Sequence, residues 1–219
     1  MNTLILKKLA IASFLLGMTE VATANLITNS SFELGGFVAD ANNAMSLLPG
    51  STAITGWSVV NAEITWLNVP NTWGVPASEG NFSLNLQGYD GLPPSGGVSQ
   101  TIATSFGQKY RLFFDLGAGG LPNWGSSSST VFVNAGNASF SFTAGWSSSY
   151  YWQPFNLDFI ADSPSTTIRF LGGSSAHHFV GLDNVSVNAI PEPEEWAMLL
   201  LGFGMIGYQV KRKQGRKAQ

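Results

Sequence analysis

Cysteine is absent from the 219 residues, and this removes one common source of stability. Without thiols the chain forms no disulfide and no thiolate metal site, so its fold must rest on a hydrophobic core, with a metal bound by other ligands as a further source of stability. The 166 residues from Asn25 to Ile190 are enough for one domain with a sizeable core.

Positive charge is scarce in the same segment. Residues 25–190 contain three cations, Lys109, Arg111 and Arg169, against nine carboxylates, which gives a net charge of −6. The whole chain has a net charge of only −3 because its two ends are basic. An acidic surface with few lysines repels phosphate backbones, and this argues against nucleic-acid binding.

Recognisable catalytic motifs are also lacking. The sequence has no Gly-x-Ser-x-Gly elbow, no His-Glu-x-x-His and no glycine-rich phosphate loop. His177 and His178 are adjacent without an evident third nitrogen or thiolate ligand, which favours a solvated loop over a metal site. The scattered carboxylates do not single out the pair that a glycosidase needs. A protein without enzymatic activity is expected, with a glycoside hydrolase as the less favoured alternative.

Residues 1–24 have the order of a secretory signal peptide. Two lysines precede an apolar run from Leu9 to Gly17, and Ala22-Thr23-Ala24 supplies the small residues of a cleavage site. The run is shorter than the roughly 20 residues that cross a bilayer as a helix. Cleavage before Asn25 is therefore favoured over a membrane anchor.

Residues 196–210 form an uncharged and largely apolar run, which five cations follow: Lys211, Arg212, Lys213, Arg216 and Lys217. As a helix rising about 1.5 Å per residue, the run covers about 22 Å and is a marginal transmembrane helix. Apolar residues surround the whole segment, which argues against a helix packed on the domain. The positive-inside rule keeps the basic tail cytoplasmic and places the residues before Trp196 on the outer side.

Between the two ends, apolar and polar residues alternate, and Gly, Ser, Asn and Pro interrupt the pattern every several residues. A period of two predicts the strands of an all-β sandwich or barrel. A short Gly/Asn loop at 134–137 predicts a hairpin between two of these strands. The predicted strands cover residues 81–87, 97–103, 110–116, 130–133, 138–143, 153–160, 166–171 and 180–188.

The segment Ile190-Pro191-Glu192-Pro193-Glu194-Glu195-Trp196, with the apolar run and the basic tail after it, resembles the PEP-CTERM sorting signal of Gram-negative bacteria. The resemblance covers residues 190–219 and implies processing by exosortase, a membrane-embedded transpeptidase, with Pro191, Glu192 and Pro193 as the sorting motif. It implies export through the Sec machinery and signal peptidase, a transient stay in the inner membrane, and a final place at the cell surface or in an exopolysaccharide matrix. The prolines keep this peptide extended at the membrane edge.

A second resemblance covers the domain itself. The opening Asn25-Leu-Ile-Thr-Asn-Ser-Ser-Phe-Glu33 and the closing Leu182-Asp183-Asn184-Val185 are similar to the galactose-binding-like jelly rolls of many carbohydrate-binding modules. This implies a jelly-roll β-sandwich over residues 25–189 whose first and last strands lie close together. It also implies a structural Ca²⁺ on Glu33 and Asp183. Calcium takes about six to eight oxygen ligands, so further ligands would have to join them. The alternative is that both carboxylates only hold turns.

Exposed aromatic side chains are the candidate ligand contacts, because sugar rings pack their C–H faces on aromatic rings. Trp73, Trp124 and Trp146 lie among Gly, Pro, Asn and Ser, which predicts exposed loops, and Tyr89 and Asp90 have similar surroundings. The alternative is that these rings fill the core. Two functions stay open: a module that binds extracellular polysaccharide, and a structural matrix or surface-coat protein that binds no small ligand.

Overall fold

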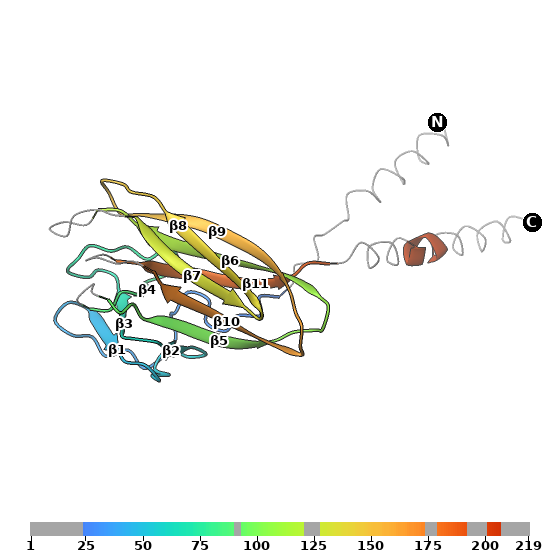
Figure 1. Cartoon of the computed structure of the whole chain (residues 1–219), viewed down its shortest axis with the longest axis horizontal. Helices are drawn as coiled ribbons and strands as arrows, with labels where there is room; N and C mark the ends of the chain where they lie inside the picture. The colour runs from blue at the N-terminus through green and yellow to red at the C-terminus, as the bar shows by residue number, and fades with distance from the viewer. Residues whose placement is uncertain (1–23, 90–92, 121–127, 174–178, 192–200, 207–219) are drawn as a thin grey trace, which may run out of the picture.

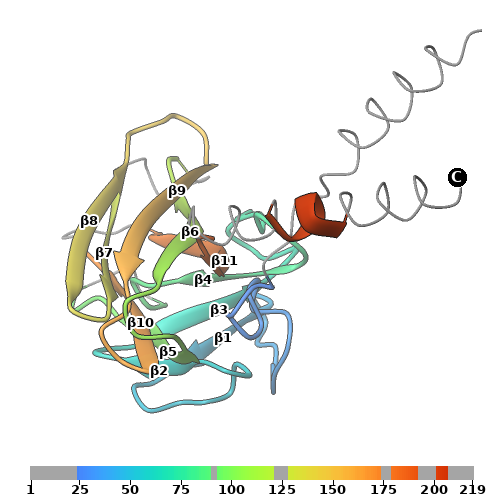
Figure 2. The same ribbon diagram turned by 90° about the vertical axis from the view of Figure 1, so that its right-hand side faces the viewer.

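Two antiparallel sheets lie face to face in the part of the chain that the structure describes (Figures 1 and 2). The structure is a computed structural model, and it describes residues 24–89, 93–120, 128–173, 179–191 and 201–206. Hydrophobic side chains from both sheets fill the space between the layers.

The strand order is that of a jelly roll. The six-stranded sheet has the order β1 (Ala44–Leu47), β3 (Ile64–Asn68), β4 (Phe82–Asn85), β11 (Gly181–Ala189), β6 (Lys109–Ala118) and β9 (Tyr151–Ile160). The five-stranded sheet has the order β2 (Ser58–Val60), β5 (Gly97–Ala103), β10 (Ser165–Gly172), β7 (Ser129–Ala135) and β8 (Ala138–Ala144). From β4 onward the chain crosses repeatedly between the sheets, so the predicted all-β sandwich is confirmed.

The strands from β4 to β11 are those that the sequence predicted, with slightly different ends. The predicted hairpin is present, since β7 pairs with β8 down to Ala135 and Ala138 and Gly136 turns with a φ of 60°. The sequence did not predict β1, β2 and β3. Two of these are only four and three residues long, and β3 is buried on both faces, so none shows a clear alternation.

Aromatic rings form the centre of the core. Phe114 of β6 meets Phe170 of β10 with 5.1 Å between the ring centroids, and Trp57 lies 6.4 Å from the same ring. Two buried indoles also fix the start of the domain, because the Trp57 Nε1–H donates to the Asn29 carbonyl and the Trp66 Nε1–H to the Phe32 carbonyl, at 3.0 and 3.1 Å. The opening turn thus closes onto the core.

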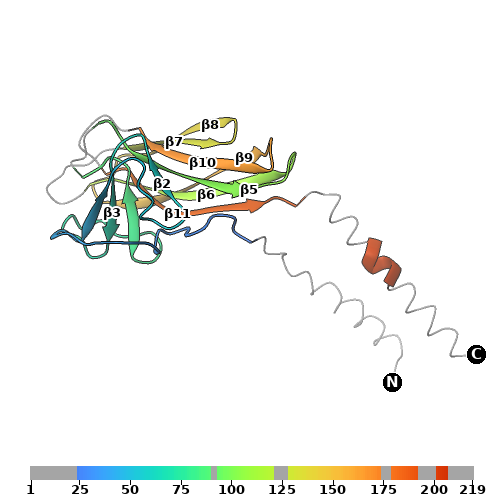
Figure 3. The ribbon, with the colours of Figure 1, turned by 90° about the horizontal axis from the view of Figure 1, so that it is seen from below.

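The first residues of the domain run beside its last strand, as the jelly-roll resemblance implied. The Leu26 N–H donates to the Val187 carbonyl at 2.9 Å, and the Ile190 N–H donates to the Lys109 carbonyl at 2.8 Å. Asn25 and Ile190 therefore lie at the same end of the sandwich, which we call the proximal end (Figure 3). The loop that joins β8 to β9 lies at the opposite, distal end, because Tyr151 pairs with Ala118 at the far end of β6.

Residues 201–206 are helical and fall within the predicted transmembrane helix 196–210. Among the described residues, no helix has the length and apolar character needed to cross a membrane. The predicted signal sequence up to residue 23, Glu192, Pro193 and most of the predicted transmembrane helix lie outside the described residues.

The aromatic core predicts a large loss of stability on truncation. Trp66 is fully buried, so Trp66→Ala should lower the free energy of unfolding by about 3–5 kcal/mol. Phe106→Ala is the control, because this ring is 79% exposed and its loss should change stability by less than about 0.5 kcal/mol. Urea unfolding of the full chain measures both values, and equal losses would contradict this description of the core.

Candidate functional site

The sequence-predicted ligand residues that the structure describes do not form one site. Trp73 and Tyr89 lie together near the β3 side of the six-stranded sheet, whereas Trp146 lies on the loop between β8 and β9. Asp90 and Trp124 lie outside the described residues. Trp73 and Trp146 therefore have to be considered separately.

Trp73 is buried, and the expectation that its loop exposes it is wrong. Only 8% of the residue is exposed, because it packs in a small second apolar cluster that includes Val75 and Phe179. Its ring lies 5.2 Å from that of Tyr89 in an edge-to-face contact. The segment between β3 and β4 therefore returns to the sheet instead of projecting into solvent.

Tyr89 is held by polar contacts with the segment before β1. Its hydroxyl donates to Asp40 Oδ2 at 2.5 Å and is contacted by the Asn42 side-chain amide. The hydrogen bond from Tyr89 holds the pKa of Asp40 below its ordinary value. These contacts give Tyr89 a structural task, that of joining two loops.

Trp146 is exposed, as predicted. It is 68% exposed, while Trp57, Trp66 and Trp73 are buried and Trp152 is half-buried with its Nε1–H donating to the Pro76 carbonyl at 3.2 Å. Its loop is anchored on both sides of the ring, because the Tyr151 hydroxyl donates to the Gly145 carbonyl at 2.8 Å and the Gly120 N–H to the Ser147 carbonyl at 3.0 Å. Trp146 thus presents an apolar face to solvent at the distal end.

Glu33 and Asp183 both hold the backbone of the segment that leads into β4. Glu33 Oε1 accepts hydrogen bonds from the N–H groups of Asn81 and Phe82, both at 2.8 Å. Asp183 Oδ2 accepts from the N–H groups of Ser78 and Glu79 at 2.7 and 3.0 Å.

These contacts match the alternative in which the two carboxylates hold turns. Two oxygens already accept two N–H groups each, and Asp183 Oδ1 accepts the Asn184 N–H at 2.7 Å. Within the described ranges, no group of three or more His, Cys, Asp or Glu side chains is placed to hold a metal. As placed, the two carboxylates do not provide a calcium site by themselves, and calcium here stays a prediction.

Asp183 lies in a buried polar environment beneath that segment. Its pKa is raised to about 7, mainly by burial and to a smaller extent by the neighbouring Asp115 carboxylate, while the three backbone N–H donors act in the opposite direction. Asp115 is the cross-strand partner of Asp183, and its Oδ2 accepts from the Ser78 hydroxyl at 2.6 Å and from the Asn184 amide at 3.1 Å. The two neighbouring carboxylates thus fix one loop and one strand bulge.

A tyrosine that the sequence did not single out completes this region. The Tyr150 hydroxyl is buried, finds no hydrogen-bond partner among the described residues, and burial raises its pKa. It lies so close to two glycines that an added Cβ at Gly117 or Gly181 would be 2.0 or 2.2 Å from its oxygen. Both positions therefore require glycine. A single sequence does not reveal that the Tyr150 ring approaches them so closely.

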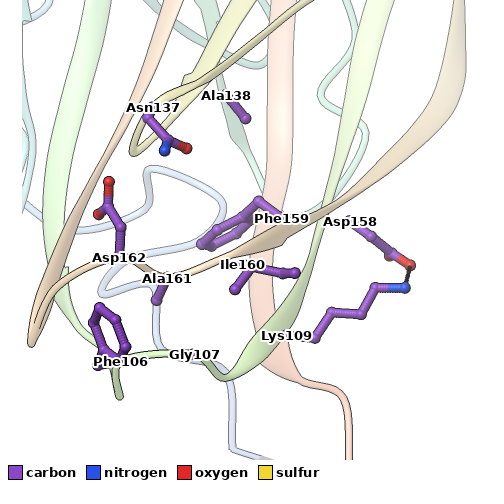
Figure 4. Close-up of a pocket in the computed structure, with 10 residues that line it drawn as sticks. All are labelled: Phe106, Gly107, Lys109, Asn137, Ala138, Asp158, Phe159, Ile160, Ala161 and Asp162. Atoms are coloured by element: carbon purple, nitrogen blue, oxygen red, sulfur yellow. Dashed lines mark ion pairs between the residues drawn. The ribbon is translucent and has the colours of Figure 1, made fainter.

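An open cavity of about 550 Å³ lies at the proximal end (Figure 4). Lys109 contributes to its lining, and its ammonium group is 2.9 Å from Asp158, which also pairs with Arg111 at 2.5 Å. The Arg111 hydrogen bond is the main reason why the pKa of Asp158 lies well below its ordinary value. These charges are satisfied by one another, and none of the predicted ligand residues that the structure describes lines the cavity.

The strand order defines the class of protein as a jelly-roll β-sandwich domain, and the chain has no cysteine to form disulfides. Residues 25–188 match the family described as "Protein of unknown function (DUF642)". The chain belongs to this DUF642 family.

One relative in sequence is Halomucin of Haloquadratum walsbyi, which is 29% identical over 187 residues. The match covers 83% of this chain and 2% of Halomucin, so the chain spans a small part of the length of this relative.

Several solved structures of carbohydrate-binding modules are similar at low sequence identity. The CBM61 module solved with β-1,4-galactotriose is 15% identical, with a TM-score of 0.44 over 77% of this chain and 100% of the module. A CBM4 structure is 17% identical with a TM-score of 0.40, over 75% and 99% of the two chains. The CBM22-1 xylan-binding domain of Paenibacillus barcinonensis Xyn10C is 12% identical with a TM-score of 0.43, over 68% and 94%. These likenesses are weak, and the β-sandwich is established by the strand order itself.

The raised pKa of Asp183 predicts a pH dependence of stability. Its contribution to stability is fully present below the unfolded pKa of about 4, and it is lost as the pH rises through about 7. Asp183→Asn should flatten this change and should lower stability by about 1–3 kcal/mol, because an amide NH₂ replaces one acceptor oxygen. Urea unfolding at a series of pH values measures the slope, and an unchanged slope in the variant would contradict the assignment.

A calcium ion on Glu33 and Asp183 would make the melting temperature depend on calcium. A bound ion stabilises the native state, so EDTA would lower the melting temperature, calcium would restore it, and Glu33→Gln would remove the response. The observed contacts favour the turn-holding alternative, for which we expect a melting temperature that neither reagent changes. Asp162→Asn is the control, because this exposed carboxylate lies at the proximal end.

Proposed function

We propose that the chain is an exported surface or matrix protein that binds extracellular polysaccharide without catalysis, through Trp146 at the distal end of the sandwich. The single observation that carries this proposal is the position of Trp146, 68% exposed on a loop anchored on both sides. Because hydrogen bonds fix the loop on both sides, the indole is already oriented to stack on a ligand, and binding would not have to order the loop.

A sugar ring fits the chemistry of this position. The indole offers a flat apolar face for the C–H face of a sugar, and nearby Ser147, Ser148 and Ser149 offer hydroxyl groups for hydrogen bonds. The loop is at the end opposite Ile190, so a domain attached through its C-terminal segment presents Trp146 away from the attachment point.

The carboxylates support a non-catalytic role. A glycosidase needs one carboxylic acid and one carboxylate that flank the sugar. Here Glu33 and Asp183 accept backbone N–H groups, Asp115 accepts a hydroxyl and an amide, and Asp158 pairs with two cations. The exposed tryptophan and these occupied carboxylates favour binding over hydrolysis.

The sorting part of the proposal rests on Pro191, Glu192 and Pro193, with the signal peptide before Asn25. Exosortase would recognise the motif at the proximal end, where the last strand of the sandwich ends. Replacing the three motif residues by alanine should leave the chain in the inner-membrane fraction instead of at the surface or in the medium. Fractionation of the native bacterium measures this, and normal release of the variant would contradict it.

Loss of the indole predicts loss of polysaccharide binding. Trp146→Ala should weaken retention on the bacterium's own exopolysaccharide by about two- to tenfold, because stacking on one aromatic ring contributes about 0.5–1.5 kcal/mol. The measurement is a pull-down of the full chain, kept in a mild detergent, over immobilised exopolysaccharide and a panel of neutral and acidic glycans.

Phe106→Ala is the matched control, because this exposed ring lies at the proximal end and its loss should leave retention unchanged. Absence of retention on every glycan, or equal retention of Trp146→Ala and the native chain, would contradict the binding proposal. The second candidate, a structural coat protein without a small ligand, would then be favoured, and the neutral sheet edge formed by β8 is the observation that supports it.

A further inference from the structure

In the described part of the chain the two sheets have four edges, and three of them carry features that prevent pairing with another chain. The edge strands β1 and β2 have only four and three residues. The edge strand β9 contains Pro154 near its middle, and Asp158 further along forms ion pairs. Short edges, prolines and charges are the usual means of blocking edge-to-edge association.

The fourth edge, β8, has none of these features. It is the outer strand of the five-stranded sheet and lies at the margin of the sandwich in Figure 2. Its seven residues, Ala-Ser-Phe-Ser-Phe-Thr-Ala, contain no charge and no proline. A strand of this length and composition at an edge offers unpaired backbone groups to another strand.

The hydrophobic core continues out to this edge. The buried Phe114 contacts Phe142 with 5.3 Å between the ring centroids, and Phe142 lies 6.4 Å from Phe140, which is 39% exposed. On the other face of β8, Thr143 and Ser139 form side-chain hydrogen bonds with β7 at 2.9 and 2.6 Å. One face of the edge is therefore aromatic and the other carries hydroxyl groups.

The sequence of β8 is symmetric in chemical character about Ser141. In an antiparallel pair of two β8 strands centred there, Ser141 faces Ser141, Phe140 faces Phe142, and Ser139 faces Thr143. Aromatic residues would then meet aromatic residues on one face, and hydroxyl groups would meet hydroxyl groups on the other. Cross-strand pairs of both kinds stabilise antiparallel sheets.

We propose that two copies of the chain associate through β8, antiparallel and centred on Ser141, so that their five-stranded sheets become one continuous sheet. The partner is a second copy because the edge is complementary to itself and because it is neutral in a domain of net charge −6. A contact between two β8 strands brings no carboxylates of these strands together. A two-fold contact of this kind closes on itself as a dimer.

Single cysteines test the register directly, because the native chain has none. Ser141→Cys should form a disulfide-linked dimer under mild oxidation, because directly opposed residues have Cα atoms about 4.5–5.5 Å apart. Thr143→Cys is the matched control on the same strand. Its two copies would lie four residues apart along the pair, about 13 Å, which is too far for a disulfide.

The experiment uses the purified full chain in a mild detergent and follows dimer formation on non-reducing gels. We expect Ser141→Cys to crosslink at least about tenfold faster than Thr143→Cys, because pairing holds the two thiols together. A mixture of Ser139→Cys with Thr143→Cys should also crosslink, since the proposed register places these two positions opposite each other. Equal slow rates for all three samples would overturn the proposal.

Charge substitutions give a second test that a folding defect does not imitate. Ser141 is exposed, so Ser141→Lys and Ser141→Glu should leave the monomer folded, with an unchanged circular dichroism spectrum, while each abolishes the dimer by opposing like charges. Mixing the two variants should restore association as a heterodimer. Sedimentation velocity measures the outcome, and a dimer unaffected by Ser141→Lys would overturn the proposal. Polysaccharide retention, which depends on Trp146, is a separate readout.

Discussion

Aromatic rings from both sheets meet in one layer, and the other features of the structure depend on this contact. Phe114 and Phe170 come from facing sheets, and Trp57 and Trp66 tie the start of the domain to the same layer through their indole N–H groups. Because the chain has no cysteine, no covalent link replaces this contact if it is lost. The positions of the loops at both ends depend on the core, because the core fixes the strands that these loops connect.

The acidic residues show how a domain with few cations uses its carboxylates. Among the described residues only Asp158 is paired with cations, while Glu33 and Asp183 accept backbone N–H groups of the segment from Ser78 to Phe82, and Asp183 also accepts that of Asn184. Backbone donors satisfy carboxylates without a counter-charge. The segment from Ser78 to Phe82 is thereby fixed over the sheet, although it contains no regular structure before β4.

The longer strands could be predicted from the sequence because one face of each is buried and the other is not, as in β6. Strand β3 could not be predicted in this way. The chain that follows it covers its second face, so apolar and polar residues do not alternate along it. Trp73 and Trp146 have similar neighbours in sequence, yet one is buried and the other exposed. Local composition predicts a loop, but the direction in which a loop folds depends on contacts distant in sequence, such as those of Tyr89 with Asp40.

Both ends of the domain leave from the proximal end, and Trp146 lies at the other. In an antiparallel β8 pair the two domains point in opposite directions, so the pair has an indole and an attachment segment at each end. Two copies fixed in one membrane would not reach this arrangement, whereas released copies would. If each domain holds one polysaccharide strand, as proposed, such a pair is a two-headed crosslinker that joins two strands, and the stiffness of the resulting network would depend on protein concentration.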